Sequence, residues 1–164
     1  MIKIGDRIPD ATLTESTEMG DACPLPPAKH AAGELVKGKR IVVFGLPGAF
    51  TPTCSAKHAP GYIARHADLR ALKVDEVWCV AVNDGFVMAA WGQQLGGLGK
   101  VRFLGDGSAE LTKKLGLEMD IPGMGVRCKR FSMLLDDGVV KHLNIEEPGK
   151  FEVSNVETML KQIS

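Results

Sequence analysis

The chain has 164 residues, 45% of them hydrophobic and 24% charged, which is typical of a globular protein and excludes a disordered or fibrous chain. Lysine plus arginine and aspartate plus glutamate number 20 each, so we expect neither nucleic acid nor an anionic membrane as a partner. The length predicts a single domain over residues 1–164, and no apolar run is as long as a membrane span.

The hydrophobic pattern alternates between strand-like and helical segments. Strands are predicted, in chain order, at residues 41–46, 77–82, 101–104, 131–135 and 139–145, with Asp137-Gly138 as the hairpin turn before the last one. Helices are predicted after Cys54, with a kink at Pro60, then at 86–95, at 109–115 and at the C-terminus behind a capping box of Ser154 and Glu157. This order predicts an α/β fold of the thioredoxin-like kind, in which helices flank both faces of a central mixed sheet. The first strands should be parallel and the last pair antiparallel.

The four cysteines are widely spaced, with no C-x-x-C pair and no histidine at zinc-finger spacing: Cys23, Cys54, Cys79 and Cys128. We therefore expect neither a metal site nor a thioredoxin-type dithiol, and the thiols should be reduced. The first residues have neither the apolar stretch of a signal peptide nor the Arg- and Ser-rich character of a transit peptide. The sequence predicts a cytoplasmic protein.

Between the first predicted strand and the first predicted helix lies the run Pro47-Gly48-Ala49-Phe50-Thr51-Pro52-Thr53-Cys54. Thr51 has the character of an N-cap and Pro52 that of the first helical residue, which puts Cys54 in the first helical turn. Free N–H groups and the helix dipole favour an anion there, and the thiolate is the reactive form of cysteine. This placement predicts that Cys54 is a nucleophile.

The same run resembles the active-site loop of the peroxiredoxins, and most closely that of the type II atypical group, the peroxiredoxin-5 subfamily. Two further blocks, at residues 80–88 and 125–133, extend the resemblance over nearly the whole chain. The resemblance implies a thiol peroxidase that reduces hydrogen peroxide and small organic hydroperoxides through a cysteine sulfenic acid. It also implies a homodimer and no cofactor beyond an external thiol reductant.

By this resemblance Cys54 is the peroxidatic cysteine, assisted by Thr51, Pro47 and Arg127. Their chemistry suits the reaction, because the departing oxygen gains negative charge and needs hydrogen-bond donors already in place. Thr51 can bind substrate or sulfur, Pro47 can shield the sulfur from water, and Arg127 can hold the thiolate as an anion. Arg130 is the alternative if Arg127 does not reach the site.

Other residues in or near the motif are candidates for the pocket, the core or a base. Phe50, Gly48 and Phe86 are candidates for the substrate pocket, although Phe86 and Trp91 also have the spacing of core residues. His58 follows Cys54 by one helical turn, as the base of a cysteine hydrolase could. No third group is evident to orient it, so we expect His58 to have a packing role.

The reduction of the sulfenic acid leaves two mechanisms open. Residues 149–154, where some relatives carry a resolving cysteine, contain none, whereas Cys79 matches a second cysteine of the plant-like members. Because Cys79 lies in an apolar strand, we expect a one-cysteine cycle in which glutathione and a glutaredoxin reduce Cys54. The alternatives are a two-cysteine peroxidase with Cys79 resolving and thioredoxin as donor, and a redox sensor or chaperone-like thiol switch.

Overall fold

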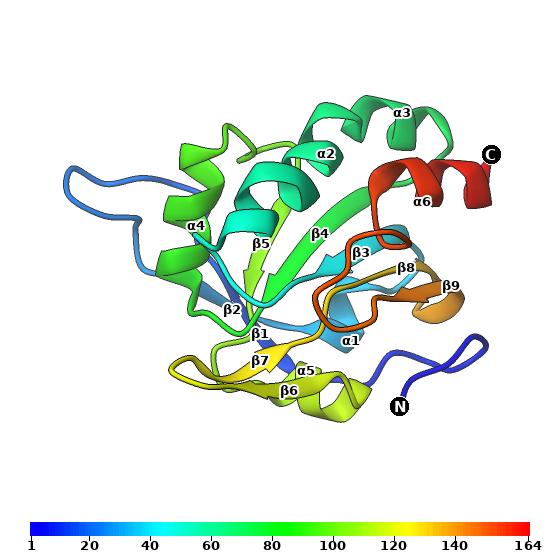
Figure 1. The fold of residues 1–164 in the computed structure, drawn as a ribbon. Helices are drawn as coiled ribbons and strands as arrows, with labels where there is room; N and C mark the ends of the chain where they lie inside the picture. The colour runs from blue at the N-terminus through cyan, green and yellow to red at the C-terminus, as the bar shows by residue number, and fades with distance from the viewer.

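A computed structural model describes residues 1–164, and a seven-stranded sheet with helices on both faces forms its centre (Figure 1). The order of strands across the sheet is β2-β1-β5-β4-β3-β8-β9. Their bounds are β1 Thr12–Glu15, β2 Ala28–Ala31, β3 Arg40–Gly45, β4 Glu76–Ala81, β5 Arg102–Gly105, β8 Phe131–Asp136 and β9 Val139–Ile145. A separate two-stranded hairpin consists of β6 Glu118–Ile121 and β7 Gly125–Cys128.

The sheet is mixed in the way that the sequence predicts. β3, β4 and β5 are parallel, whereas β8 is antiparallel both to β3 and to β9. Asp137 and Gly138 turn the β8–β9 hairpin with φ angles of 48° and 80°, the left-handed conformation that a tight hairpin requires. These features confirm the thioredoxin-like α/β fold.

The helices divide between the two faces of the sheet (Figure 1). Their bounds are α1 Ala32–Leu35, η1 Cys54–His58, α2 Ala59–Ala64, α3 His66–Ala71, α4 Gly85–Gln94, α5 Glu110–Leu115 and α6 Val156–Ile163. A core layer of 20 buried residues lies under η1, α2, α3, α4 and α6, and a second layer of 19 lies under α1 and α5. Cys54 and Cys79 belong to the first layer and Cys128 to the second, so the sheet separates Cys128 from Cys54.

Two local predictions are wrong. The N-cap of α6 is Asn155, whose side chain accepts from the Thr158 N–H at 2.8 Å, because the Ser154 hydroxyl is bonded to Glu146 instead. Phe86 is 43% exposed at the start of α4, whereas Trp91 is buried in the core as expected. No helix combines the length and the apolar character that crossing a membrane would need.

Candidate active site at Cys54

The loop after β3 delivers Cys54 to the start of a helix, as the sequence predicts. Helical structure begins at Pro52, and the first intrahelical bond runs from the Ser55 N–H to the Thr51 carbonyl at 2.9 Å. The N–H groups of Thr53 and Cys54 precede that bond and so have no acceptor within the helix. They can bind a negatively charged oxygen or sulfur.

The irregularity expected at Pro60 is a π-helical turn over Cys54–His58. In that turn the Ala59 N–H bonds to the Cys54 carbonyl, five residues back. Proline cannot supply the N–H that an α-helix would need at position 60, and the wider turn accommodates its ring. Both ends of the turn, Cys54 and His58, are buried.

Short hydrogen bonds fix the loop that precedes Cys54. The Ala49 N–H donates to Asn83 Oδ1 at 2.9 Å, which ties the loop to the end of the next strand. The Thr51 hydroxyl donates to the Gly48 carbonyl at 2.7 Å. Because its proton is engaged there, the Thr51 oxygen is oriented to accept a hydrogen bond from a hydroperoxide O–H.

The arginine at the sulfur is Arg130, not Arg127. Arg130 Nη2 donates to Cys54 Sγ at 3.1 Å, and Nη1 donates to His58 Nδ1 at 3.0 Å. Arg127 donates instead to the carbonyls of Pro47 and Met124, each at 3.3 Å. The expectation for Arg127 is thus corrected, and the alternative residue makes the contact.

Strand pairing explains why Arg130, and not Arg127, lies beside the Cys54 sulfur. Arg130 directly precedes β8, whose first residue, Phe131, is opposite Gly45 at the end of β3. The chain after β3 leads to Cys54, so the residue before β8 lies beside that loop. Arg127 belongs to β7, which pairs with β6 outside the main sheet.

Arg127 nevertheless lies against the loop. A Cβ atom at Gly48 would be 2.6 Å from Arg127 Nη1, so a larger residue there would require the end of the arginine side chain to shift. Of the predicted pocket residues, Gly48 therefore contacts Arg127, while Phe50 is 52% exposed and points away from the core with a φ of 61°. Backbone in that region is costly for a residue other than glycine.

His58 is a neutral hydrogen-bond partner of Arg130. Burial, together with the charge of Arg130, lowers the pKa of His58 from 6.5 to about 3. Its Nε2–H donates to the Ser154 carbonyl at 3.1 Å, which leaves Nδ1 as the acceptor for Arg130. Since Nδ1 is occupied by the guanidinium, His58 is not arranged as the general base of a hydrolase.

The depressed pKa of His58 has a measurable effect on stability. The unfolded chain protonates this residue near pH 6.5 and the folded chain only near pH 3, so protons favour unfolding between these values. We expect the free energy of unfolding to fall by on the order of 2 kcal/mol between pH 6.5 and 4.5. In His58→Gln this contribution should be absent. Urea titrations of both proteins at several pH values measure it, and equal pH slopes would contradict the assignment.

The other three cysteines are either buried or carried by a loop other than the active-site loop. Cys79 is fully buried in β4, and burial raises the pKa of its thiol well above the ordinary value. Burial also raises the pKa of Cys128 to about 12, on the opposite side of the sheet. Cys23 is exposed in the loop between β1 and β2. All four thiols are free.

Cys54 itself has no exposed surface, but its neighbours line a cavity of about 630 Å³. Pro47, Thr53 and Arg130 line it, and of these Arg130 bonds to the sulfur. The rest of the wall consists of Lys129, apolar side chains and the segment after β9: Met1, Met119, Ile121, Ile145 and residues 146–150. Phe50, Gly48 and Phe86 are not in this wall, so this cavity does not use the predicted pocket residues.

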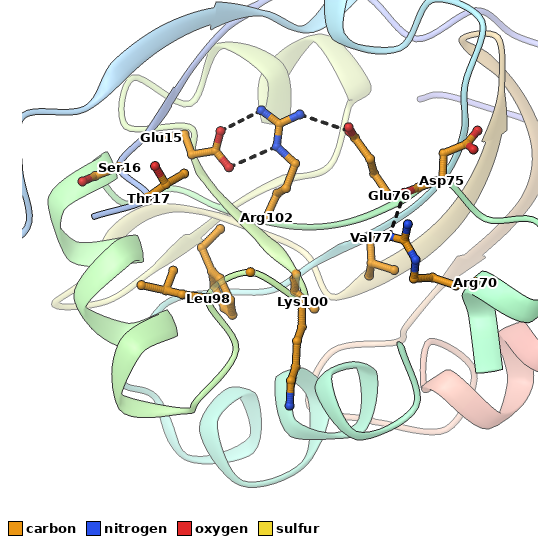
Figure 2. A pocket seen from close by; sticks show the side chains of 13 residues that line it. Glu15, Ser16, Thr17, Arg70, Asp75, Glu76, Val77, Leu98, Lys100 and Arg102 are labelled. Carbon is orange, nitrogen blue, oxygen red and sulfur yellow. Dashed lines mark hydrogen bonds and ion pairs between the residues drawn. The ribbon is translucent and has the colours of Figure 1, made fainter. Parts of the chain in front are cut away.

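A second cavity, of about 460 Å³, lies at the opposite ends of the parallel strands (Figure 2). Arg102 is the first residue of β5, and Figure 2 shows its guanidinium between Glu15 and Glu76. Its bonds to these carboxylates measure 2.7 and 3.0 Å to Glu15 and 3.0 Å to Glu76. Lys39 also pairs with Glu76, at 3.0 Å, so that two cations balance the two carboxylates. The cluster is remote from Cys54.

Sequence reasoning missed three parts of the site: the role of Asn83 in fixing the loop, the bond from His58 to Arg130, and the contact of Ser154 with His58. Asn83 lies within a block already noted, directly after a predicted strand, where side chains reach the same sheet edge as Cys54. The Ser154 contact is made by a backbone carbonyl, which leaves no signal in residue type.

Comparisons with known proteins show similarity over almost the full chain. Residues 3–160 match the family described as Redoxin. Peroxiredoxin-2E-2, chloroplastic, of Oryza sativa subsp. japonica is 48% identical, and the match covers 99% of this chain and 72% of that protein. Peroxiredoxin-2B of Arabidopsis thaliana is 43% identical, with 99% and 98% covered. The crystal structure of reduced Prx3 in complex with hydrogen peroxide from Vibrio vulnificus has a TM-score of 0.91 at 44% identity, and all of both chains is covered.

Proposed function

The chain belongs to the redoxin family and is a peroxiredoxin, a thiol-dependent peroxidase, and from this premise we propose that Cys54 is its peroxidatic cysteine. The proposed substrates are hydrogen peroxide and small organic hydroperoxides. The observation that carries the proposal is the 3.1 Å contact of Arg130 with the sulfur at a helix start. Both features stabilise a thiolate. The motif also favours the type II atypical group, the peroxiredoxin-5 subfamily.

In the proposed reaction the Cys54 thiolate attacks the nearer peroxide oxygen. A sulfur–oxygen bond forms while the oxygen–oxygen bond breaks, and the bonding pair leaves on the far oxygen, which takes a proton to become water or an alcohol. Cys54 becomes a sulfenic acid. Arg130 and the free N–H groups of Thr53 and Cys54 supply donors for the growing charge. The Thr51 oxygen accepts from the peroxide O–H, and Pro47 covers the sulfur.

We propose a one-cysteine cycle for the return to the thiol. Glutathione attacks the sulfenic acid, water leaves, and the resulting mixed disulfide is reduced by a glutaredoxin. The burial of Cys79 within β4, hydrogen-bonded on both sides to β3 and β5, supports this route. A disulfide with Cys79 would require the helix at Cys54 to unwind, as the alternative with thioredoxin demands.

Intact mass after one equivalent of hydrogen peroxide distinguishes these cycles. We expect a gain of one oxygen, which glutathione converts into a glutathione adduct, in the wild type and in Cys79→Ser alike. A loss of two hydrogens that disappears in Cys79→Ser would instead show that Cys79 resolves the sulfenic acid. Continuous peroxide consumption with glutathione and glutaredoxin is also expected, whereas a single turnover that never recycles would favour a redox switch.

We further propose that the protein forms a homodimer through the face beside the active-site loop. Three large apolar side chains are exposed there: Phe50, Phe86 and Met124. The Ala49–Asn83 bond joins the loop that carries Phe50 to the residues directly before α4, which carries Phe86, and Arg127 bonds to the carbonyls of both Met124 and Pro47. Contiguous exposed apolar surface is typical of a protein–protein interface. Sedimentation velocity distinguishes the dimer from the 17.6 kDa monomer.

A further inference from the structure

A single buried carboxylate organises the segment between β9 and α6, residues 146–155, here called the C-terminal strap. Glu146 is 6% exposed and accepts hydrogen bonds from three successive backbone N–H groups. The distances to Glu146 Oε2 are 2.8 Å from each of Glu152, Val153 and Ser154, and the Ser154 hydroxyl adds a fourth at 2.7 Å. The strap is thus folded back onto the residue from which it starts.

The strap in turn contacts the pair formed by His58 and Arg130. The Ser154 carbonyl accepts from His58 Nε2 at 3.1 Å and from the Tyr62 hydroxyl at 2.8 Å. The centre of the Phe151 ring lies 5.0 Å from the centre of the His58 ring and 5.8 Å from the guanidinium carbon of Arg130. Two separate contacts, one polar and one aromatic, therefore depend on where the strap lies.

We propose that Glu146 is a positioning residue for peroxide reduction, holding Arg130 against the Cys54 sulfur through Ser154 and His58. The carboxylate fixes the Ser154 carbonyl, the carbonyl fixes the proton of His58 on Nε2, and Nδ1 then accepts from Arg130. The second guanidinium nitrogen is directed at the sulfur as a result. This inference rests on the proposed function of Cys54 and adds a residue that acts on the sulfur through Arg130.

The ionisation of Glu146 is consistent with this arrangement. Burial alone would raise the pKa of the carboxyl, but the four bonds from the strap outweigh it and the pKa lies below its ordinary value. A glutamine amide oxygen could occupy the position of Oε2, but it carries no charge and therefore accepts weaker hydrogen bonds. Its N–H group would face the Glu152 N–H, which now also bonds to Oε1 at 3.0 Å, so the strap should shift in a Glu146→Gln protein.

A direct effect of charge predicts the opposite result, which makes the proposal testable. Removal of a negative charge near Cys54 favours the thiolate and should move its formation to lower pH. Loss of a well-placed Arg130 disfavours the thiolate and should move its formation to higher pH. The pH profile of Cys54 alkylation by iodoacetamide, which needs no peroxidase activity, separates the two.

The experiment compares Glu146→Gln with Glu152→Gln, a neighbouring glutamate of the strap whose side chain is exposed. In Glu146→Gln we expect alkylation of Cys54 to shift to higher pH and the rate constant for hydrogen peroxide to fall about tenfold or more, as displaced catalytic groups commonly cause. Glu152→Gln should behave as the wild type. An unchanged or downward pH shift in folded Glu146→Gln would overturn the proposal.

A double-mutant cycle tests whether Glu146 acts through Arg130. If it does, Glu146→Gln should cost little further rate in an Arg130→Gln protein, whereas an equal loss in both backgrounds would contradict the relay. If Glu146→Gln does not fold, Ser154→Ala replaces it, because this change removes only the hydroxyl bond to Glu146 and keeps the backbone N–H. We expect alkylation of Cys54 in Ser154→Ala to shift to higher pH by a smaller amount, and an unchanged pH profile would contradict the proposal. A wild-type protein without rapid peroxide reduction would refute the proposed function alone.

Discussion

Replacing Cys54 by serine is expected to abolish rapid peroxide consumption, the largest loss that one substitution in this chain should cause. A serine hydroxyl is not ionised at neutral pH and cannot form a sulfenic acid, so neither Arg130 nor the helix start can restore the reaction. The rate constant for hydrogen peroxide, measured by stopped-flow competition, should fall to that of free thiols, several orders of magnitude lower. Cys23→Ser, which removes the exposed thiol, is the matched control and should retain the parent rate. Rapid consumption by Cys54→Ser would show that the nucleophile lies elsewhere.

Arg130→Gln is expected to slow peroxide reduction by about a hundredfold, the effect of removing a donor aimed at the developing charge. The substitution removes the cation from the sulfur and also the donor to His58 Nδ1. The same stopped-flow measurement checks this, and alkylation of Cys54 should require higher pH.

Arg127→Gln is the informative comparison, because both arginines lie in one short segment and only Arg130 contacts the sulfur. Loss of the bond to the Pro47 carbonyl should loosen the loop and slow the reaction by less than about tenfold, since a neutral hydrogen bond contributes about 1 kcal/mol. A larger effect at Arg127 than at Arg130 would restore the assignment made from the motif.

The elements with a strong hydrophobic pattern were predictable, and those without one were not. β3, β4, β5, β8 and β9 were all located from their apolar runs to within about one residue, since each is largely buried or sits in a clear hairpin. β1, β2, β6 and β7 were missed. Each of them has only four residues, and β2 is mostly exposed, so none of them shows a clear hydrophobic pattern. β1 and β2 are recognisable as strands because they pair with each other.

The site illustrates the same division. The position of Cys54 followed from local rules of helix capping, whereas the choice between Arg127 and Arg130 depended on which strand lies beside β3. Once β8 is known to run antiparallel to β3, the residue before β8 must lie next to the residues after β3. The strap could not have been foreseen, because Glu146 binds backbone N–H groups that every residue type except proline offers.

The complete burial of Cys54 bears on which electron donors can work quickly. Because Cys54 has no exposed surface, we expect a protein donor to reach it only after the turn at Cys54–His58 opens. In the proposed cycle glutathione would approach through the 630 Å³ cavity, whose wall includes Arg130, the residue bonded to the sulfur. Local opening of a packed turn is rare under native conditions. Under the proposed cycle we therefore expect glutathione to reduce the sulfenic acid faster than a protein donor does, and parallel rate measurements with glutathione and with thioredoxin test this.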